Sequence, residues 1–152
     1  MHKPSLIRLA VAAAVCTVAV QVSAQSKPRV IEITGNDQMK FSVTAITAKP
    51  GESLTVRLKS TGTLPKIAMA HNFVLLAATT DVAAFIKAAA TSSPTYIPAA
   101  MKASVLAMTG LAGPGETVTV TFKAPAKPGK YPFVCSFPGH YLSGMKGDLT
   151  VK

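Results

Sequence analysis

Cysteine is scarce in this sequence of 152 residues, which has two, at positions 16 and 135. Cys16 lies in an N-terminal segment that we expect to be removed, so Cys135 would be the single thiol of the mature chain. A single thiol excludes an internal disulfide. The Cys135 thiol could then form an intermolecular disulfide, be a buried inert side chain, bind a metal as a ligand or act as a nucleophile. Because a free reactive thiol is a hazard in an oxidising compartment, we expect the Cys135 thiol to be bound to another group.

Acidic residues are also few, with 6 Asp and Glu against 16 Lys and Arg. Lys3 and Arg8 belong to the N-terminal segment, and without them 14 basic residues remain, a net charge of about +8. The basic residues are scattered along the sequence and form no arginine cluster. Nucleic-acid-binding proteins usually concentrate positive charge on one stripe or helix. The pattern therefore favours a solvated basic surface and no nucleic-acid partner, although it leaves open steering toward an acidic protein.

The N-terminus is typical of a secretory signal peptide. Lys3 and Arg8 precede the apolar run 6–22, and Val22-Ser23-Ala24 is a small-residue cleavage site. We expect residues 1–24 to be a signal peptide and residues 25–152 to be one exported domain without a membrane span. Two alternatives stay open here. The apolar run could be an N-terminal anchor, or Cys16 could be a lipoprotein attachment site.

The mature chain is predicted to be all-β. Residues 53–58 alternate apolar and polar side chains, residues 116–123 do the same, and residues 72–78 form a continuous apolar run. Further strands are expected at these ranges: 30–33, 41–48, 104–108, 131–135 and 148–151. Short strands separated by Gly and Pro turns indicate an antiparallel sandwich or barrel. Asp81 can cap one short helical flap with Val82, Phe85, Ile86 and Ala89 on its apolar side.

The donor side chains form a recognisable set. The mature sequence has one cysteine, Cys135, and two histidines, His71 and His140, and Met145 follows close behind. A thiolate, two imidazoles and a weak axial thioether are the ligands of a blue-copper electron-transfer site. Taken singly, a lone Met is ordinary core filler and a lone His is usually a surface residue. Together they point to one copper ion, Cu(I)/Cu(II), because sulfur suits Cu(I) and nitrogen suits Cu(II).

The segments around these donors resemble the copper loops of the azurin family. The resemblance lies in residues 69–75 (MAHNFVL) and 135–140 (CSFPGH), and also in residues 35–39 (GNDQM) and 145–151 (MKGDLTV). It extends over essentially the whole mature chain. Four residues separate His140 from Met145, one more than in typical azurins, and this spacing is similar to that of auracyanin, an azurin relative of photosynthetic bacteria. The azurin disulfide is absent, and Ala70 stands where azurins carry a glycine.

The resemblance implies a Greek-key β-sandwich of eight strands and a periplasmic electron carrier. It makes His71, Cys135 and His140 the equatorial ligands and Met145 the axial ligand. It gives Asn72 the task of bracing the ligand loops and hydrogen-bonding the thiolate. It also implies that redox protein partners, of the cytochrome or copper type, dock at an apolar patch around His140. That patch would be formed by Met39, Met69, Phe137, Pro138 and Leu142.

The residues also restrict the rival functions. Two histidines cannot supply the second, histidine-rich site that a copper enzyme of the nitrite-reductase type needs, and one cysteine cannot form a binuclear copper site. A hydrolase using Cys135 and His140 is formally possible, but it would lack an acidic orienting group and leave His71 unexplained. Copper storage or delivery would use similar ligands in a more open site. We therefore expect an electron carrier and not an enzyme.

Overall fold

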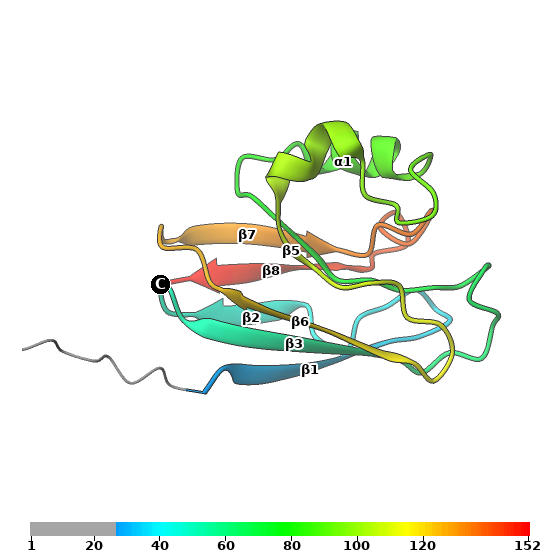
Figure 1. The fold of residues 1–152 in the computed structure, drawn as a ribbon, viewed down its shortest axis with the longest axis horizontal. Coiled ribbons are helices and arrows are strands. Elements are labelled where there is room, and N and C mark those ends of the chain that lie inside the picture. The colour runs from blue at the N-terminus through cyan, green and yellow to red at the C-terminus, as the bar shows by residue number, and fades with distance from the viewer. Residues whose placement is uncertain (1–26) are drawn as a thin grey trace, which may run out of the picture.

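The computed structural model describes residues 27–152, which form a β-sandwich of two sheets with a helical flap (Figure 1). The predicted signal peptide, residues 1–24, lies outside the described residues and stays a prediction. The first sheet has the order β1-β3-β6 and the second has the order β2-β8-β7-β4-β5. The bounds of the strands are β1 Arg29–Gly35, β2 Ala45–Ala48, β3 Ser53–Ser60, β4 Val74–Leu76, β5 Val105–Met108, β6 Thr117–Lys123, β7 Gly129–Val134 and β8 Lys146–Val151.

The predicted all-β sandwich is confirmed, but two of its strand pairs are parallel where antiparallel pairing was expected. β1 pairs with β3 in parallel, and β2 pairs with β8 in parallel, while the remaining pairs are antiparallel. Partners in a parallel pair are not joined by a tight turn. The hydrophobic alternation that locates each strand carries no information on its direction, so the sequence could not show these pairings.

The predicted inward faces form the main core between the two sheets. In β3 the alternation places Leu54, Val56 and Leu58 in this core, with 0% exposure. Phe73 and Phe133 meet at the centre with ring centroids 5.0 Å apart. Burying such side chains contributes about 1.5–3 kcal/mol each to folding. This dry, close-packed layer is the rigid support for the loops at one end of the sandwich.

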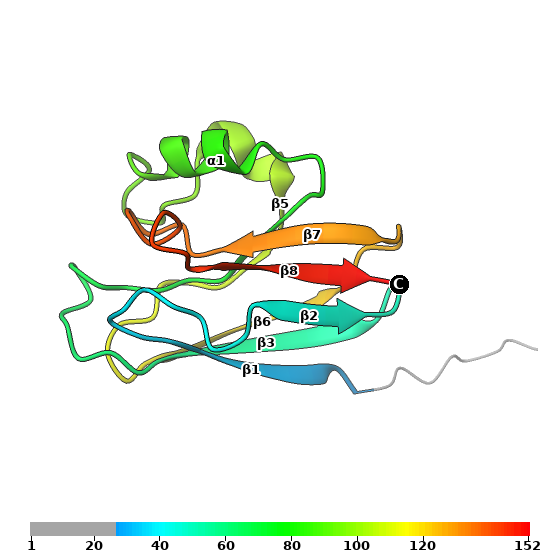
Figure 2. The same ribbon diagram turned by 180° about the vertical axis from the view of Figure 1, so that it is seen from behind.

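Helix α1, Val82–Ala89, covers the outer face of the five-stranded sheet. It lies above β7 in both views of the molecule (Figures 1 and 2). The Asp81 carboxylate accepts a hydrogen bond from the Ala84 N–H at 3.0 Å, which is the predicted N-cap. Phe85 and Ala89 pack with Val74 and Leu76 in a second core. The side chains of β4 are therefore buried on both faces of the sheet, which explains why β4 lies in a continuous apolar run of the sequence. A 3-10 helix, Ala99–Ser104, was not predicted from the sequence.

Candidate metal centre

The loops at one end of the sandwich bring three donor side chains together. His71 lies just before β4 and is held by paired backbone hydrogen bonds with Ala112, at 3.0 and 2.7 Å. Cys135 follows the last residue of β7, and His140 lies in the loop that returns to β8. The candidate ligand atoms of the three residues all lie within 4.8 Å of one another. Residues 69 positions apart in the sequence thus face a single point.

Two of the three donor–donor separations are those expected of ligands to one metal ion. The Nδ1 atoms of His71 and His140 are 3.2 Å apart, and the Cys135 Sγ is 3.4 Å from the His140 Nδ1. These are the separations expected for two nitrogens about 2.0 Å from one ion and a sulfur about 2.3 Å from it. They apply when the angles between the ligands at the ion are near tetrahedral. The three side chains are 0–1% exposed, so the donors are already dry and fixed.

Met145 lies beside this group and is fully buried. The Cys135 N–H donates to the Met145 carbonyl at 3.0 Å, and the Met145 N–H donates to the His140 carbonyl at 3.0 Å. The backbone of the loop therefore links three of the four predicted ligands directly. Gly144, with φ +99°, turns the chain immediately before Met145, a conformation that favours glycine.

Asn72 braces the two ligand loops, as predicted. Its side-chain N–H donates to the Ser136 hydroxyl at 2.9 Å, and its side-chain oxygen accepts from the Ser136 N–H at 2.9 Å. This pair ties the residue after His71 to the residue after Cys135. The backbone N–H groups of Asn72 and Phe137 also hydrogen-bond the Cys135 sulfur.

Burial controls the protonation of the donors in the metal-free protein. It raises the pKa of the Cys135 thiol to about 11, although the two backbone N–H groups oppose the shift. Burial, together with a smaller effect of the neighbouring His71, lowers the pKa of His140 to about 4. Burial likewise lowers the pKa of His71, while the Asp37 carboxylate partly opposes this. At neutral pH both imidazoles are therefore unprotonated and able to bind a metal, while the thiol must release a proton.

The comparisons with known proteins agree with this geometry. Residues 29–152 match the family model described as copper binding proteins, plastocyanin/azurin family. The chain belongs to this family. The family is that of the cupredoxins, electron-transfer copper proteins, and the His71, Cys135 and His140 cluster fits a single type 1 copper site.

Relatives of this cupredoxin include azurins and auracyanins. An azurin of Pseudomonas denitrificans is 42% identical over 127 residues, which cover 80% of this chain and 97% of that one. Auracyanin-B of Chloroflexus aurantiacus is 46% identical over 83 residues, which are 53% of this chain but only 35% of that relative. Among solved structures, auracyanin A of the same organism, titled a "blue" copper protein, superposes with a TM-score of 0.73 at 34% identity, covering 83% of this chain and 100% of that one.

Two residues of this cupredoxin centre were not singled out by the sequence analysis. A Cβ added to Gly35, at the end of β1, would lie 2.8 Å from the Met145 Cε and 2.9 Å from the His71 Cδ2, so only glycine lets both side chains sit there. Lys40 donates a hydrogen bond to the Ser143 carbonyl in the ligand loop. Gly35 appeared in the sequence analysis only within residues 35–39, because its role depends on contacts with residues 36 and 110 positions away.

The predicted apolar patch is only partly on the surface. Leu142 is 82% exposed and Pro138 is exposed, whereas Met39 and Met69 are half-buried. Phe137 was expected in the patch, but it is only 7% exposed. Its ring packs between Tyr96 and His140, with centroids 5.0 and 4.8 Å away. The Tyr96 ring, in the segment that follows α1, covers it, and the sequence could not give the position of this segment.

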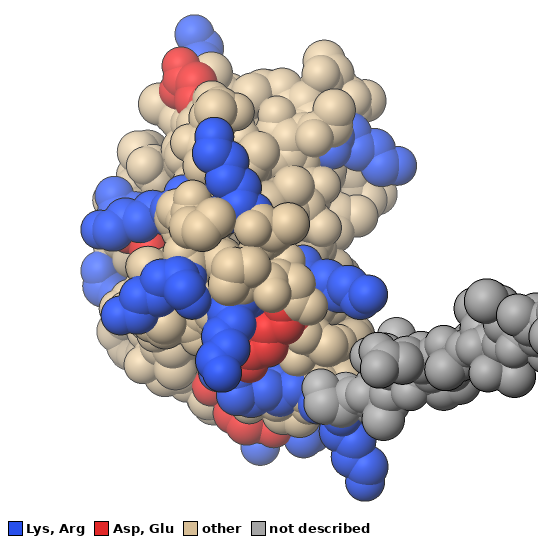
Figure 3. Space-filling model, turned by 90° about the vertical axis from the view of Figure 1, so that its left-hand side faces the viewer, with Lys and Arg blue, Asp and Glu red and all other residues tan. Residues whose placement is uncertain are grey.

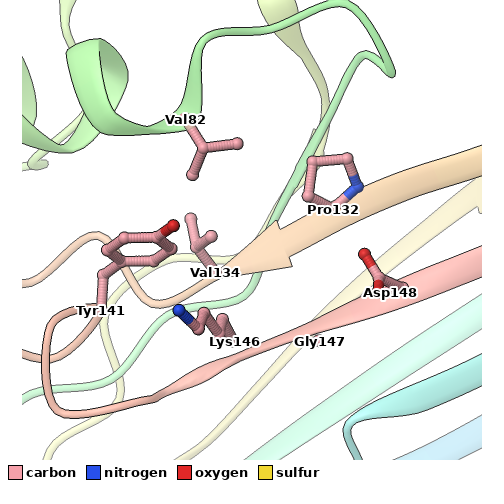
Figure 4. A pocket seen from close by; sticks show the side chains of 7 residues that line it. All are labelled: Val82, Pro132, Val134, Tyr141, Lys146, Gly147 and Asp148. Carbon is pink, nitrogen blue, oxygen red and sulfur yellow. The ribbon is translucent and has the colours of Figure 1, made fainter.

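Two hollows adjoin the ligand loop beneath and beside α1. One, of about 290 Å³, lies between Ile86 and Lys87 of α1 and residues Pro138, Tyr141 and Leu142. Figure 4 shows the other, of about 220 Å³, where Val82 faces β7 and β8 and where Lys146 lies close to Tyr141. The Lys146 ammonium is 4.5 Å from the centre of the Tyr141 ring. This cation–π contact fixes the ligand loop to the start of β8.

Proposed function

We propose that this protein carries single electrons through a mononuclear type 1 copper site held by His71, Cys135, His140 and, axially, Met145. The convergence of three buried donors within 4.8 Å carries the proposal. Copper bound there supplies a one-electron couple. The chain contributes a donor set that suits both oxidation states, since the thiolate favours Cu(I) and the imidazoles favour Cu(II). The strand ends and the Asn72–Ser136 bridge hold these donors in place, so little has to move when the charge changes.

We place electron exchange at the surface formed by Pro138 and Leu142. Leu142 is 82% exposed beside the hollow that α1 borders, and large exposed apolar side chains often mark sites of protein contact. Phe137 directly precedes Pro138, and its ring centroid is 4.8 Å from that of His140, so it would form part of the covered path. A redox protein with a matching apolar face, of the cytochrome or copper type, is the proposed partner.

We also propose that the protein works in the periplasm as a carrier without catalytic turnover. The support for export is the sequence of residues 1–24, with its basic start, apolar run and small-residue cleavage site. Among the described residues, no helix is long and apolar enough to cross a bilayer. The support for a carrier is that both histidines and the single cysteine of the described chain are used in one buried centre.

Reversible voltammetry combined with a metal-transfer assay tests this function against copper storage. The copper-loaded protein is expected to show a reversible one-electron wave and to keep its copper when an apo metal-binding protein is added. The low exposure of the donors is the reason, because an incoming ligand cannot reach the metal. An irreversible wave with rapid loss of copper would favour storage or delivery.

A further inference from the structure

The strand ends opposite the metal centre gather basic side chains from distant parts of the sequence. The start of β1, β3 and β7 and the end of β2, β6 and β8 meet here, as the pairing of Ser53 with Lys123 and of Gly129 with Val151 shows. Seven exposed cations lie at or next to these ends, and we call them the basic pole: Lys27, Arg29, Lys49, Lys123, Lys127, Lys130 and Lys152. These residues are scattered along the sequence, and the fold brings them together at one end of the sandwich.

The basic pole is poorly neutralised. Among the described residues, Glu52 is the acidic side chain at these strand ends, and it pairs with Arg29 at 2.7 Å. The other acidic residues of β1 and β8, Glu32 and Asp148, lie in mid-strand. Figure 3 looks onto this end and shows Lys and Arg side chains spread across it, with few Asp and Glu between them.

We propose that the basic pole binds the anionic phospholipid headgroups of a membrane surface. Six of its seven cations are lysines, which act as hydrated point charges and do not form the paired forks that favour specific recognition. Three hollows among residues 27–152 are lined by residues outside the basic pole. Clustered cations of this kind are attracted to anionic lipid, and the attraction weakens with salt.

The position of the basic pole along the chain favours a membrane over an acidic protein as its binding partner. Lys27, the first described residue, belongs to the basic pole, and the apolar run 6–22 ends only a few residues before it. This pole is therefore the part of the domain nearest the bilayer while that run is attached. After cleavage, charge alone would hold the domain, so the binding would be weak and reversible.

Binding of the basic pole to lipid would orient the domain with its metal centre away from the membrane. β3 runs from the basic pole to the metal end, and its eight residues span about 25 Å. A domain resting on lipid through the basic pole would therefore present Leu142 and the metal centre away from the bilayer. The membrane would restrict diffusion to two dimensions and leave the exchange surface free.

Co-sedimentation with lipid vesicles tests this inference, and copper is not needed for the readout. The purified exported protein is expected to bind vesicles that contain phosphatidylglycerol at low salt, and to bind vesicles of phosphatidylcholine alone hardly at all. The triple variant Lys123→Gln, Lys127→Gln, Lys130→Gln should lower the bound fraction several-fold. The control Lys59→Gln, Lys87→Gln, Lys102→Gln changes the net charge equally at exposed sites away from the pole and should bind nearly as the native protein does.

Three outcomes would overturn the inference. Equal losses in the two triple variants would mean that total charge, not the pole, governs binding. Equal binding to neutral vesicles would point to insertion of an apolar segment. No binding to anionic vesicles at low salt would exclude lipid and leave an acidic protein as the partner class for this pole. Each result is independent of the electron-carrier proposal, because the same preparations can be loaded with copper and their spectra recorded.

Discussion

Met145 differs from the other predicted ligands in strength and in role. His71, Cys135 and His140 provide donors that bind copper strongly, whereas a thioether is a weak, long axial ligand in sites of this class. The loop fixes the backbone of Met145 through two hydrogen bonds, so its position does not depend on the metal. Its side chain is therefore suited to adjusting the reduction potential and is not needed to retain the ion.

For Met145→Leu we expect a protein that still binds copper and remains blue, with a higher reduction potential. The substitution removes a donor and adds apolar bulk, which disfavours Cu(II) more than Cu(I). Voltammetry beside the visible spectrum measures both properties. A potential that fell or stayed constant would show that Met145 is not axial, and the longer His140-to-Met145 loop would be the first cause to examine.

The pKa shifts of the donors predict how the stability of the copper-free protein depends on pH. The pKa of His140 is about 4 in the folded protein against 6.5 when free, so the unfolded chain binds this proton more tightly. Stability should therefore fall as the pH drops from about 6.5 toward 4, by on the order of 2–3 kcal/mol. The pKa of Cys135 is raised from 9.0 to about 11, so its contribution is complete below about pH 9 and is lost as the pH rises through 11.

Denaturant unfolding of the copper-free protein at a series of pH values measures this profile, which should be flat between about pH 6.5 and 9. The variant Cys135→Ala is the matched control, since it should lose the alkaline decline and keep the acidic one. An alkaline decline that persisted unchanged in this variant would contradict the assignment to the thiol.

At the scale of elements, the end of β1 supports the centre through Gly35. A Cβ at this position would meet both His71 and Met145, so the end of the strand packs closely against two predicted ligands. Gly35→Ala should lower the free energy of unfolding by about 1–3 kcal/mol and alter the visible spectrum, because a ligand side chain must shift. Denaturant unfolding and absorption spectroscopy measure the two effects.

Gly110→Ala is the control, because a Cβ there meets nothing within 4 Å. This variant should match the native protein in spectrum and in stability. If Gly35→Ala behaved in the same way, the contact between β1 and the two side chains would not matter to the centre.

Strands and helices could be predicted where a short stretch of sequence carries the signal for them. The alternation of residues 53–58 and the Asp81 cap are local signals, and both elements formed as predicted. The expected strand over residues 72–78 is shorter, only Val74–Leu76, and Asn72 instead uses its side chain to bridge to Ser136. The parallel pairs β1–β3 and β2–β8 arise from packing of distant segments, which no local pattern records.

At the scale of the whole molecule, the sandwich has two different ends. One carries the metal centre and the exposed apolar side chain of Leu142, and the other carries the basic pole. The clustering of His71, Cys135 and His140 could be predicted because they are rare residue types with a distinctive order. The basic pole could not, since its lysines are common residues that only the fold brings together, and Phe137 was misplaced because the Tyr96 ring covers it.

The exposed face near the metal centre gives a prediction about exchange. Leu142→Glu should slow electron exchange with a redox partner and leave the visible spectrum nearly unchanged, because it puts a charge on the apolar surface without touching a ligand. Leu106→Glu places the same change on β5, where the leucine is 43% exposed, and should have little effect. Stopped-flow rates for the two variants measure the difference, and equal rates would move the exchange surface elsewhere.

The central claim is that His71, Cys135 and His140 hold one type 1 copper ion. Titration of the copper-free protein with Cu(II), followed by visible absorption, tests it most directly. The account predicts an intense thiolate-to-copper band at the red end of the spectrum that saturates at one ion per chain. In Cys135→Ala the band should be absent although the sandwich stays folded, as circular dichroism would show. A folded Cys135→Ala protein that kept the band, or a native protein that never developed it, would contradict the account.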